Sequence, residues 1–162
     1  MADDCFSLGN LKKQYGNLRK RYSLPSFGDL NRDFEIEKLQ ERETETLTRE
    51  IRRAMSEKSL SYLKFAEMFM NPSQAPMFFF ALVKSLDSED RRLLEELYID
   101  LGKIEIKSIA LDNDYDEGKD IDFIKIFYKK WQEIKKKFGK IMDGIEKSWE
   151  KKIDKRDKGY LG

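Results

Sequence analysis

Apolar residues recur at helical spacing along most of this chain, and the pattern is most regular near the C-terminus. There, one set of apolar side chains recurs every seven residues. A second set of three lies three residues after each of the first three members of the first set. The first set is Ile124, Trp131, Phe138 and Ile145, and the second is Phe127, Ile134 and Ile141. These are the a and d positions of three heptads, so the pattern predicts a final helix over about 120–156 that buries one apolar stripe.

The rest of the chain is also predicted to be helical. Only three prolines occur, all before residue 77, while Lys, Glu, Leu and Ile dominate, which is typical of long helices. Apolar spacing predicts a first helix over 8–22, a long helix over about 35–70, a short buried helix over 76–86, and a helix over 88–111 that Ser88 caps. We therefore expect an all-α fold, an irregular bundle of about five helices in which the two long ones pack together.

The length of 162 residues predicts a single domain. Within it we expect three segments: the first helix and an irregular strap over 1–34, a helical core over 35–156, and a flexible tail over 157–162. We expect the strap to be anchored to the helices by Phe27, Leu30 and Phe34, because a connector with so many apolar side chains would not stay exposed to solvent.

The chain resembles an intracellular protein in its cysteine content and in its first residues. Cys5 is its single cysteine, which excludes an internal disulfide, and no secretory signal peptide is recognisable. The most apolar stretch, residues 75–83, ends at Lys84 and is shorter than the ~20 residues that a membrane-spanning helix needs. We expect a cytoplasmic location and no transmembrane segment.

Most catalytic and metal-binding chemistries are excluded by composition. Histidine is absent, which removes the commonest general base and metal ligand, and one cysteine cannot build a zinc site. No Gly-rich phosphate loop, nucleophile elbow or dinucleotide fingerprint occurs, and no small-molecule substrate is evident. We predict no catalytic residues, no cofactor and no metal ligands, and hence no enzyme.

An acidic loop offers the one pattern that suggests a cation. Asp112, Asp114 and Asp116 alternate, as oxygen ligands do in calcium-binding loops. The rest of that template fails, because Gly118 stands at the seventh position instead of the sixth and Phe123 replaces the bidentate glutamate at the twelfth. A solvated loop in which Asp120 or Asp122 caps the final helix is therefore favoured over a metal site.

Carboxylates along the predicted long helix suggest an enzyme as a third hypothesis. Paired carboxylates can act as acid and base or bridge two metals in a bundle. The candidates are Glu35, Glu37, Glu41, Glu43, Glu45, Glu50, Glu57 and Glu67. The di-metal arrangement also requires Glu-x-x-His, which this chain lacks, so a solvated charged face is favoured.

Charge is sorted along the sequence. Residues 1–24 carry a net charge of +3, residues 25–124 carry −9, and residues 125–162 carry +7. Lysines of the final helix lie off its apolar stripe and form a basic ridge of Lys129, Lys130, Lys136, Lys137, Lys140, Lys147, Lys151 and Lys152. Such a ridge can neutralise phosphates, so a nucleic-acid-associated accessory protein is the second hypothesis.

The end of the final helix is the other candidate surface. Beyond Ile145 the heptad pattern stops, but Trp149, Ile153, Tyr160 and Leu161 keep an apolar character within a lysine-rich tail. A tail of this kind could bind a protein partner or a second copy of the chain. Our first hypothesis is accordingly a non-enzymatic protein-interaction or scaffold module that could self-associate.

Overall fold

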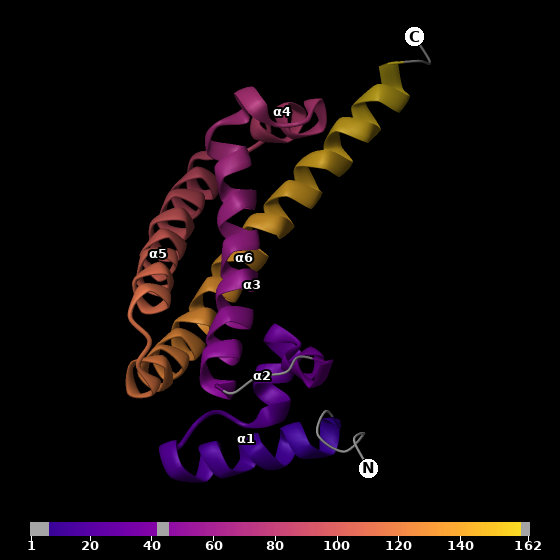
Figure 1. The fold of residues 1–162 in the computed structure, drawn as a ribbon. Coiled ribbons are helices and arrows are strands. Elements are labelled where there is room, and N and C mark those ends of the chain that lie inside the picture. Colours follow the sequence, from indigo (N-terminus) through magenta and orange to yellow (C-terminus); the bar gives the residue numbers. More distant parts are fainter. Residues whose placement is uncertain (1–6, 42–45, 160–162) are drawn as a thin grey trace. The chain divides into compact units, whose positions relative to one another are not determined.

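The computed structural model describes residues 7–41 and 46–159 (Figure 1). Cys5 lies outside the described residues. Within them the chain forms six α-helices and two short 3₁₀-helices, with no strand. The predicted all-α fold is confirmed, and α3 and α6 correspond to the two predicted long helices; α5, with 26 residues, is as long as α3, with 24.

The helices follow one another along the chain as Figure 1 shows. Their bounds are α1 Leu8–Tyr22, α2 Phe27–Phe34, η1 Ile36–Glu41, α3 Leu47–Met70, η2 Pro72–Gln74, α4 Met77–Val83, α5 Ser88–Asn113 and α6 Glu117–Gly159.

The predicted irregular strap is instead a helix, and the predicted long helix is shorter. Ser26 caps α2 by accepting a hydrogen bond from the Asp29 backbone N–H at 3.0 Å, and Leu30 is buried as expected. Glu35 then adopts a left-handed conformation with φ of 53°, which ends α2. The next six residues form the 3₁₀-helix η1, so the long helix α3 begins at Leu47 and not near Glu35.

Two other helix starts differ from the sequence-based expectation. Asp87, not Ser88, caps α5, since its Oδ1 accepts a hydrogen bond from the Asp90 backbone N–H at 2.8 Å. Asp116 caps α6, with its Oδ1 accepting from the Lys119 N–H at 2.8 Å, so this helix begins at Glu117. Asp120, predicted as a possible cap, is fully buried.

The chain divides into two compact units. Unit 1 comprises residues 1–60 and 104–131, and unit 2 comprises residues 61–103 and 132–162. The boundaries fall inside α3, α5 and α6, so each unit contains part of these three helices. The single-domain organisation stays a prediction.

Aromatic packing joins α2 to α6 in unit 1. The ring centroid of Phe34 lies 5.7 Å from that of Phe127 and 5.3 Å from that of Trp131. All three side chains are buried. Burial of each contributes about 1.5–3 kcal/mol relative to exposure, which gives this eight-residue helix the tertiary support that its length requires.

Unit 1 also buries an arginine among polar partners from three helices. The Arg52 guanidinium of α3 is fully buried and donates to Asp120 Oδ1 of α6 at 2.7 Å. It also donates to Asp112 Oδ1 at 2.6 Å and to the Ser108 hydroxyl at 3.1 Å, both on α5. A buried charge is tolerated only when it is paired and hydrogen-bonded, so this network defines how the three helices meet within unit 1.

Unit 2 is built around stacked aromatics and one close backbone approach. Tyr62 of α3 stacks on Phe138 of α6, with ring centroids 4.3 Å apart. Gly144 of α6 faces the buried carboxyl of Asp90, and a Cβ at this glycine would lie 2.7 Å from Asp90 Oδ1. A side chain at residue 144 would therefore force the Asp90 carboxyl to move.

The predicted heptad stripe is confirmed. Six of its seven residues are buried, and Phe138, the seventh, is half-buried beneath Tyr62. The first three stripe positions lie in unit 1 and the remaining four in unit 2, so the apolar face of one helix supplies core residues to both units.

Alanine substitution should distinguish two glycines of α6. We expect G144A to lower the free energy of unfolding by about 1–3 kcal/mol, because the added methyl group overpacks against Asp90. G139A is the matched control: it has no neighbouring atom within 4 Å and should raise the same quantity by about 1 kcal/mol through helix propensity. Chemical denaturation measures both, and stabilisation by both substitutions would refute the close approach.

Two neighbouring arginines of α3 provide a test of the buried network. We expect R52A to lower the free energy of unfolding by about 3–5 kcal/mol, since it leaves Asp120 buried without its cation. R53A is the control, because Arg53 also donates to Asp112, at 3.2 Å, but is partly exposed and should cost at most about 1 kcal/mol. Equal losses of stability in urea titrations would contradict the assignment.

Candidate interaction surface

The most apolar stretch of the chain is largely exposed. This stretch, residues 75–83, lies largely within the short buried helix predicted over 76–86, but in α4 only Leu82 is buried. Met77 is 89% exposed, Phe78 52% and Phe80 41%. The expectation of burial is therefore wrong, and large exposed apolar side chains of this kind mark interaction sites when they gather in one patch.

Helix α4 packs one side against the rest of unit 2 and exposes the other. On the inner side, the Phe79 ring contacts those of Phe65 and Phe69 of α3, with centroids 6.4 and 5.4 Å away. Leu82, three residues later, continues the same buried side. Met77 and Phe80 are also three residues apart and share the opposite side of the helix.

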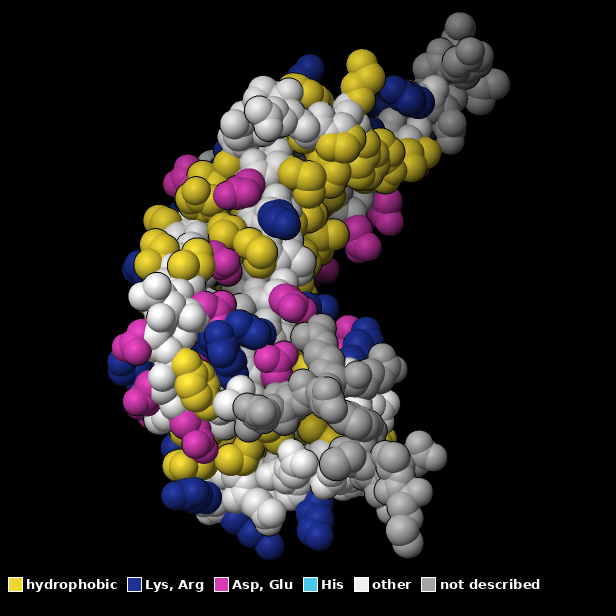
Figure 2. Space-filling view, in the orientation of Figure 1, with side chains coloured by type: hydrophobic (Ala, Val, Ile, Leu, Met, Phe, Trp, Pro, Cys, Tyr) yellow, Lys and Arg dark blue, Asp and Glu magenta, His cyan; other side chains and the backbone are white. Residues whose placement is uncertain are grey.

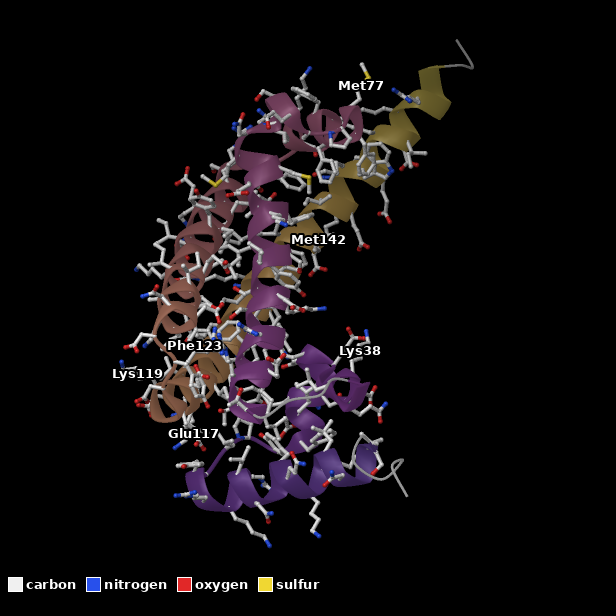
Figure 3. The ribbon with its side chains drawn as sticks, in the orientation of Figure 1. Lys38, Met77, Glu117, Lys119, Phe123 and Met142 are labelled. Carbon is white, nitrogen blue, oxygen red and sulfur yellow. The ribbon has the colours of Figure 1, made fainter. Side chains whose placement is uncertain are left out.

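The last turns of α6 extend this exposed apolar surface. Trp149 of α6 contacts Phe78 edge-on, with ring centroids 5.1 Å apart, and Ile153, one turn further, is 47% exposed. We call Met77, Phe78, Phe80, Trp149 and Ile153 the α4 patch. Figure 2 shows apolar side chains gathered over α4 and the adjoining part of α6, and Figure 3 shows Met77 pointing outward from α4.

Polar contacts hold α4 against α6. The Lys152 ammonium of α6 donates to the Ala81 carbonyl oxygen, and the Ser148 hydroxyl donates to the Ser85 carbonyl oxygen at 3.3 Å. The Lys152 bond satisfies a carbonyl in the last turn of α4, where a helix leaves such groups without intrahelical partners, and the Ser148 bond satisfies one in the turn after α4. The patch is thus presented on an anchored helix.

The predicted tail interface is brought together only in part. Trp149 and Ile153 join α4 in one patch, whereas Tyr160 and Leu161 lie outside the described residues. Sequence reasoning missed α4 as part of this surface. The available signal was the absence of any charge except Lys84 between Met68 and Leu86.

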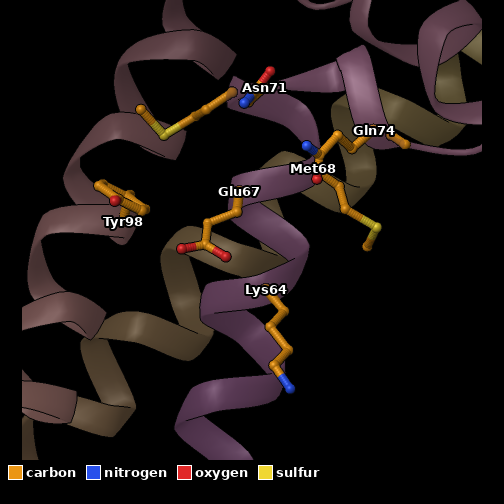
Figure 4. A pocket seen from close by; sticks show the side chains of 8 residues that line it. Lys64, Glu67, Met68, Asn71, Gln74 and Tyr98 are labelled. Carbon is orange, nitrogen blue, oxygen red and sulfur yellow. The ribbon is translucent and has the colours of Figure 1, made fainter.

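A groove of about 540 Å³ opens beside the C-terminal end of α3 in unit 2. Met68 and Met70 of α3 and Tyr98 of α5 contribute apolar surface, and Met70 and Tyr98 are 45% and 37% exposed. Figure 4 shows the Glu67 carboxylate on the side of Tyr98 and Lys64 pointing away from it. Methionine side chains adapt their shape readily, which suits such a groove to an apolar insert.

The predicted basic ridge separates into two sets. Five exposed lysines, at spacings of seven and four residues, lie along one line of α6: Lys129, Lys136, Lys140, Lys147 and Lys151. The other three, Lys130, Lys137 and Lys152, are half-buried. The Lys137 ammonium lies 3.1 Å from a carboxylate oxygen of Glu96 and 3.0 Å from one of Asp100. Burial lowers the pKa of Lys137, but the two carboxylates outweigh this effect and hold the pKa above its usual range.

Acidic neighbours interrupt the exposed lysine line. Glu133 and Asp143 fall three or four residues from its members, on the same side of α6. The folded chain also mixes the charge that the sequence sorts. Unit 1 carries 17 Lys and Arg against 18 Asp and Glu, and unit 2 carries 15 against 13, so neither unit is strongly charged.

The alternating aspartates of the acidic loop have separate partners. Asp112 pairs with Arg52 and Arg53. Burial alone would raise the pKa of Asp112, but the two guanidinium groups hold this pKa below its usual range. Asp114 pairs with Lys119 at 3.3 Å, and Asp116 caps α6. Burial raises the pKa of Asp120 although Arg52 opposes this effect. Among residues 7–41 and 46–159, no group of three or more potential ligands is arranged to hold a metal ion.

The predicted carboxylate candidates do not form one cluster. Glu35 pairs with Lys38, and Glu37 accepts a hydrogen bond from Asn31, both outside α3. Glu50 and Glu57 line a groove of about 430 Å³ in unit 1 together with Glu105 and Asp112, and Arg53 donates to two of these four carboxylates. Glu67 belongs to unit 2, and the side chains of Glu41, Glu43 and Glu45 lie outside the described residues.

The chain shows no significant match to any protein-family model, curated protein or solved structure. None of the helices in the described residues is both long enough and apolar enough to cross a membrane.

Proposed function

We propose that this protein is a non-enzymatic protein-interaction module and that the α4 patch is its docking surface. The observation that carries the proposal is the exposure of Met77, Phe78 and Phe80 in the most apolar stretch of the chain. Moving one such side chain from water into an interface contributes about 1.5–3 kcal/mol. A partner that covers the patch would recover this free energy.

The composition of the patch supports a protein partner. Interface centres are enriched in methionine and aromatic residues and depleted of charge. The patch contains one methionine, two phenylalanines and a tryptophan, and Lys84 is the single charged residue between Met68 and Leu86. A solvated surface has no need of such residues.

Anchoring of α4 supports the proposal further. Phe79 packs on α3, and Lys152 and Ser148 bind carbonyls of α4 and the turn after it. A surface that is already ordered loses little conformational entropy when a partner binds.

We continue to predict a cytoplasmic location for the protein.

Photo-crosslinking in the native cells tests the proposal. A crosslinking amino acid at Met77 should give light-dependent adducts of a few defined masses, because this side chain lies at the proposed contact. The control position is Lys140, exposed on the lysine line of α6. Since both sites are exposed, neither change should alter stability by more than about 0.5 kcal/mol. Identical adducts from both positions, or none from Met77, would refute the docking surface.

Nucleic-acid binding is the second candidate, and the line of five exposed lysines on α6 is the observation that favours it. Its interruption by Glu133 and Asp143 and the absence of arginine along it weaken phosphate recognition. We therefore expect no binding of labelled single- or double-stranded nucleic acid at physiological salt. Binding that weakens with a log–log salt slope of several, and that K136E/K140E abolishes, would establish the second candidate instead.

A further inference from the structure

Unit 2 carries both a projecting apolar face and an open apolar groove. We propose that the partner of the α4 patch is a second copy of this chain, whose groove beside Met70 and Tyr98 receives the outer face of α4. The inference rests on the proposed function and names the partner for the same surface.

The outer face of α4 has the form of an insert. Met77, Phe80 and Lys84 are spaced three and four residues apart, and Lys84 keeps a helical backbone conformation with φ of −66° and ψ of −18°. The three side chains therefore follow one side of the helix. An apolar pair followed by one positive charge is what a complementary site has to match.

The groove offers the matching chemistry. Its exposed apolar side chains are Met70 and Tyr98, and the Glu67 carboxylate stands on the same side as Tyr98 (Figure 4). Its volume of about 540 Å³ is within the range of pockets that enclose ligands of several large groups. Met77 and Phe80 would contact Met70 and Tyr98, with Lys84 beside Glu67.

Charge complementarity favours a second copy over an unrelated partner. Lys84 is the single charge of the insert. The groove is lined by Glu67 and Lys64, but only the Glu67 carboxylate lies on the side of Tyr98, so the charge beside the apolar groups there is opposite to that of the insert (Figure 4). Within the described residues, neither Lys84 nor Glu67 forms an ion pair. Pairing between copies would give each a partner.

The arrangement can close on itself. Each copy contributes one insert and one groove, so a twofold axis would form the same contact twice. Such an isologous interface stops at two chains, whereas a contact made in one direction would continue into a larger ring or a filament. The proposal therefore specifies a dimer.

Sedimentation equilibrium of the full chain over micromolar concentrations tests the inference. The wild-type protein should approach twice the chain mass of 19.3 kDa, and M77D should remain monomeric. K84E and E67K should each weaken dimerisation by about tenfold, because each places like charges together. The double variant K84E/E67K restores opposite charges and should dimerise within about threefold of wild type.

Matched controls separate this contact from general effects of charge. K140E reverses an exposed lysine of the lysine line on α6, and E57K makes the same reversal as E67K elsewhere on α3, so neither should alter dimerisation. Circular dichroism checks that each variant remains helical. The charge-swapped pair keeps the inference testable even where M77D fails to fold.

The outcomes distinguish the inference from the proposed function. A wild-type protein that stays monomeric at every concentration overturns the second copy as partner, while adducts of Met77 with another protein would leave the interaction module intact. A dimer unaffected by M77D and by both charge reversals overturns the placement of the contact. Open-ended assembly overturns the twofold arrangement.

Discussion

The apolar face of α6 has to be covered, and contacts from all the other α-helices of the described chain reach this helix. In unit 1, α2 packs Phe34 against it, α3 pairs Arg52 with its Asp120, and α1 reaches Glu117 through the Tyr22 hydroxyl. In unit 2, α3, α4 and α5 contact it through aromatic rings, carbonyls and carboxylates. Because a helix cannot bury its own apolar stripe, other helices have to cover the heptad positions, and these aromatic and polar contacts hold them against α6.

The same requirement explains the two unusual features of the core. Arg52 can be buried in unit 1 because Asp120, Asp112 and Ser108 accept its hydrogen bonds at 2.6–3.1 Å, so that its charge is compensated. Gly144 leaves room for the buried Asp90 carboxyl of α5, which a methyl group at this position would have to displace. Both contacts are specific to one register of the helices, whereas apolar packing alone tolerates shifts.

Apolar side chains of α4 are exposed because other elements pack against only one side of this helix. Its inner side is filled by Phe79 and Leu82, and no described element covers Met77 or Phe80. A patch of methionine and aromatic side chains on an anchored helix is suited to a protein partner. The lysine line of α6, in contrast, is interrupted by acidic residues, as is usual on the solvated side of a long helix.

The sequence by itself determined the all-α class, the buried stripe of α6 and the apolar character of Trp149 and Ile153, because helical periodicity states which side of a segment is apolar. It did not determine α2 or the start of α3, where the expected strap and the expected start of the long helix were wrong. Tertiary structure decided what covers each side: Met77 and Phe80 are exposed although their segment is the most apolar, and Arg52 is buried although it is charged. Local spacing cannot report such outcomes, since Arg52 and Asp120 meet across 68 residues of chain. The sorted charge of the sequence is likewise mixed within each unit, because α6 contributes residues to both.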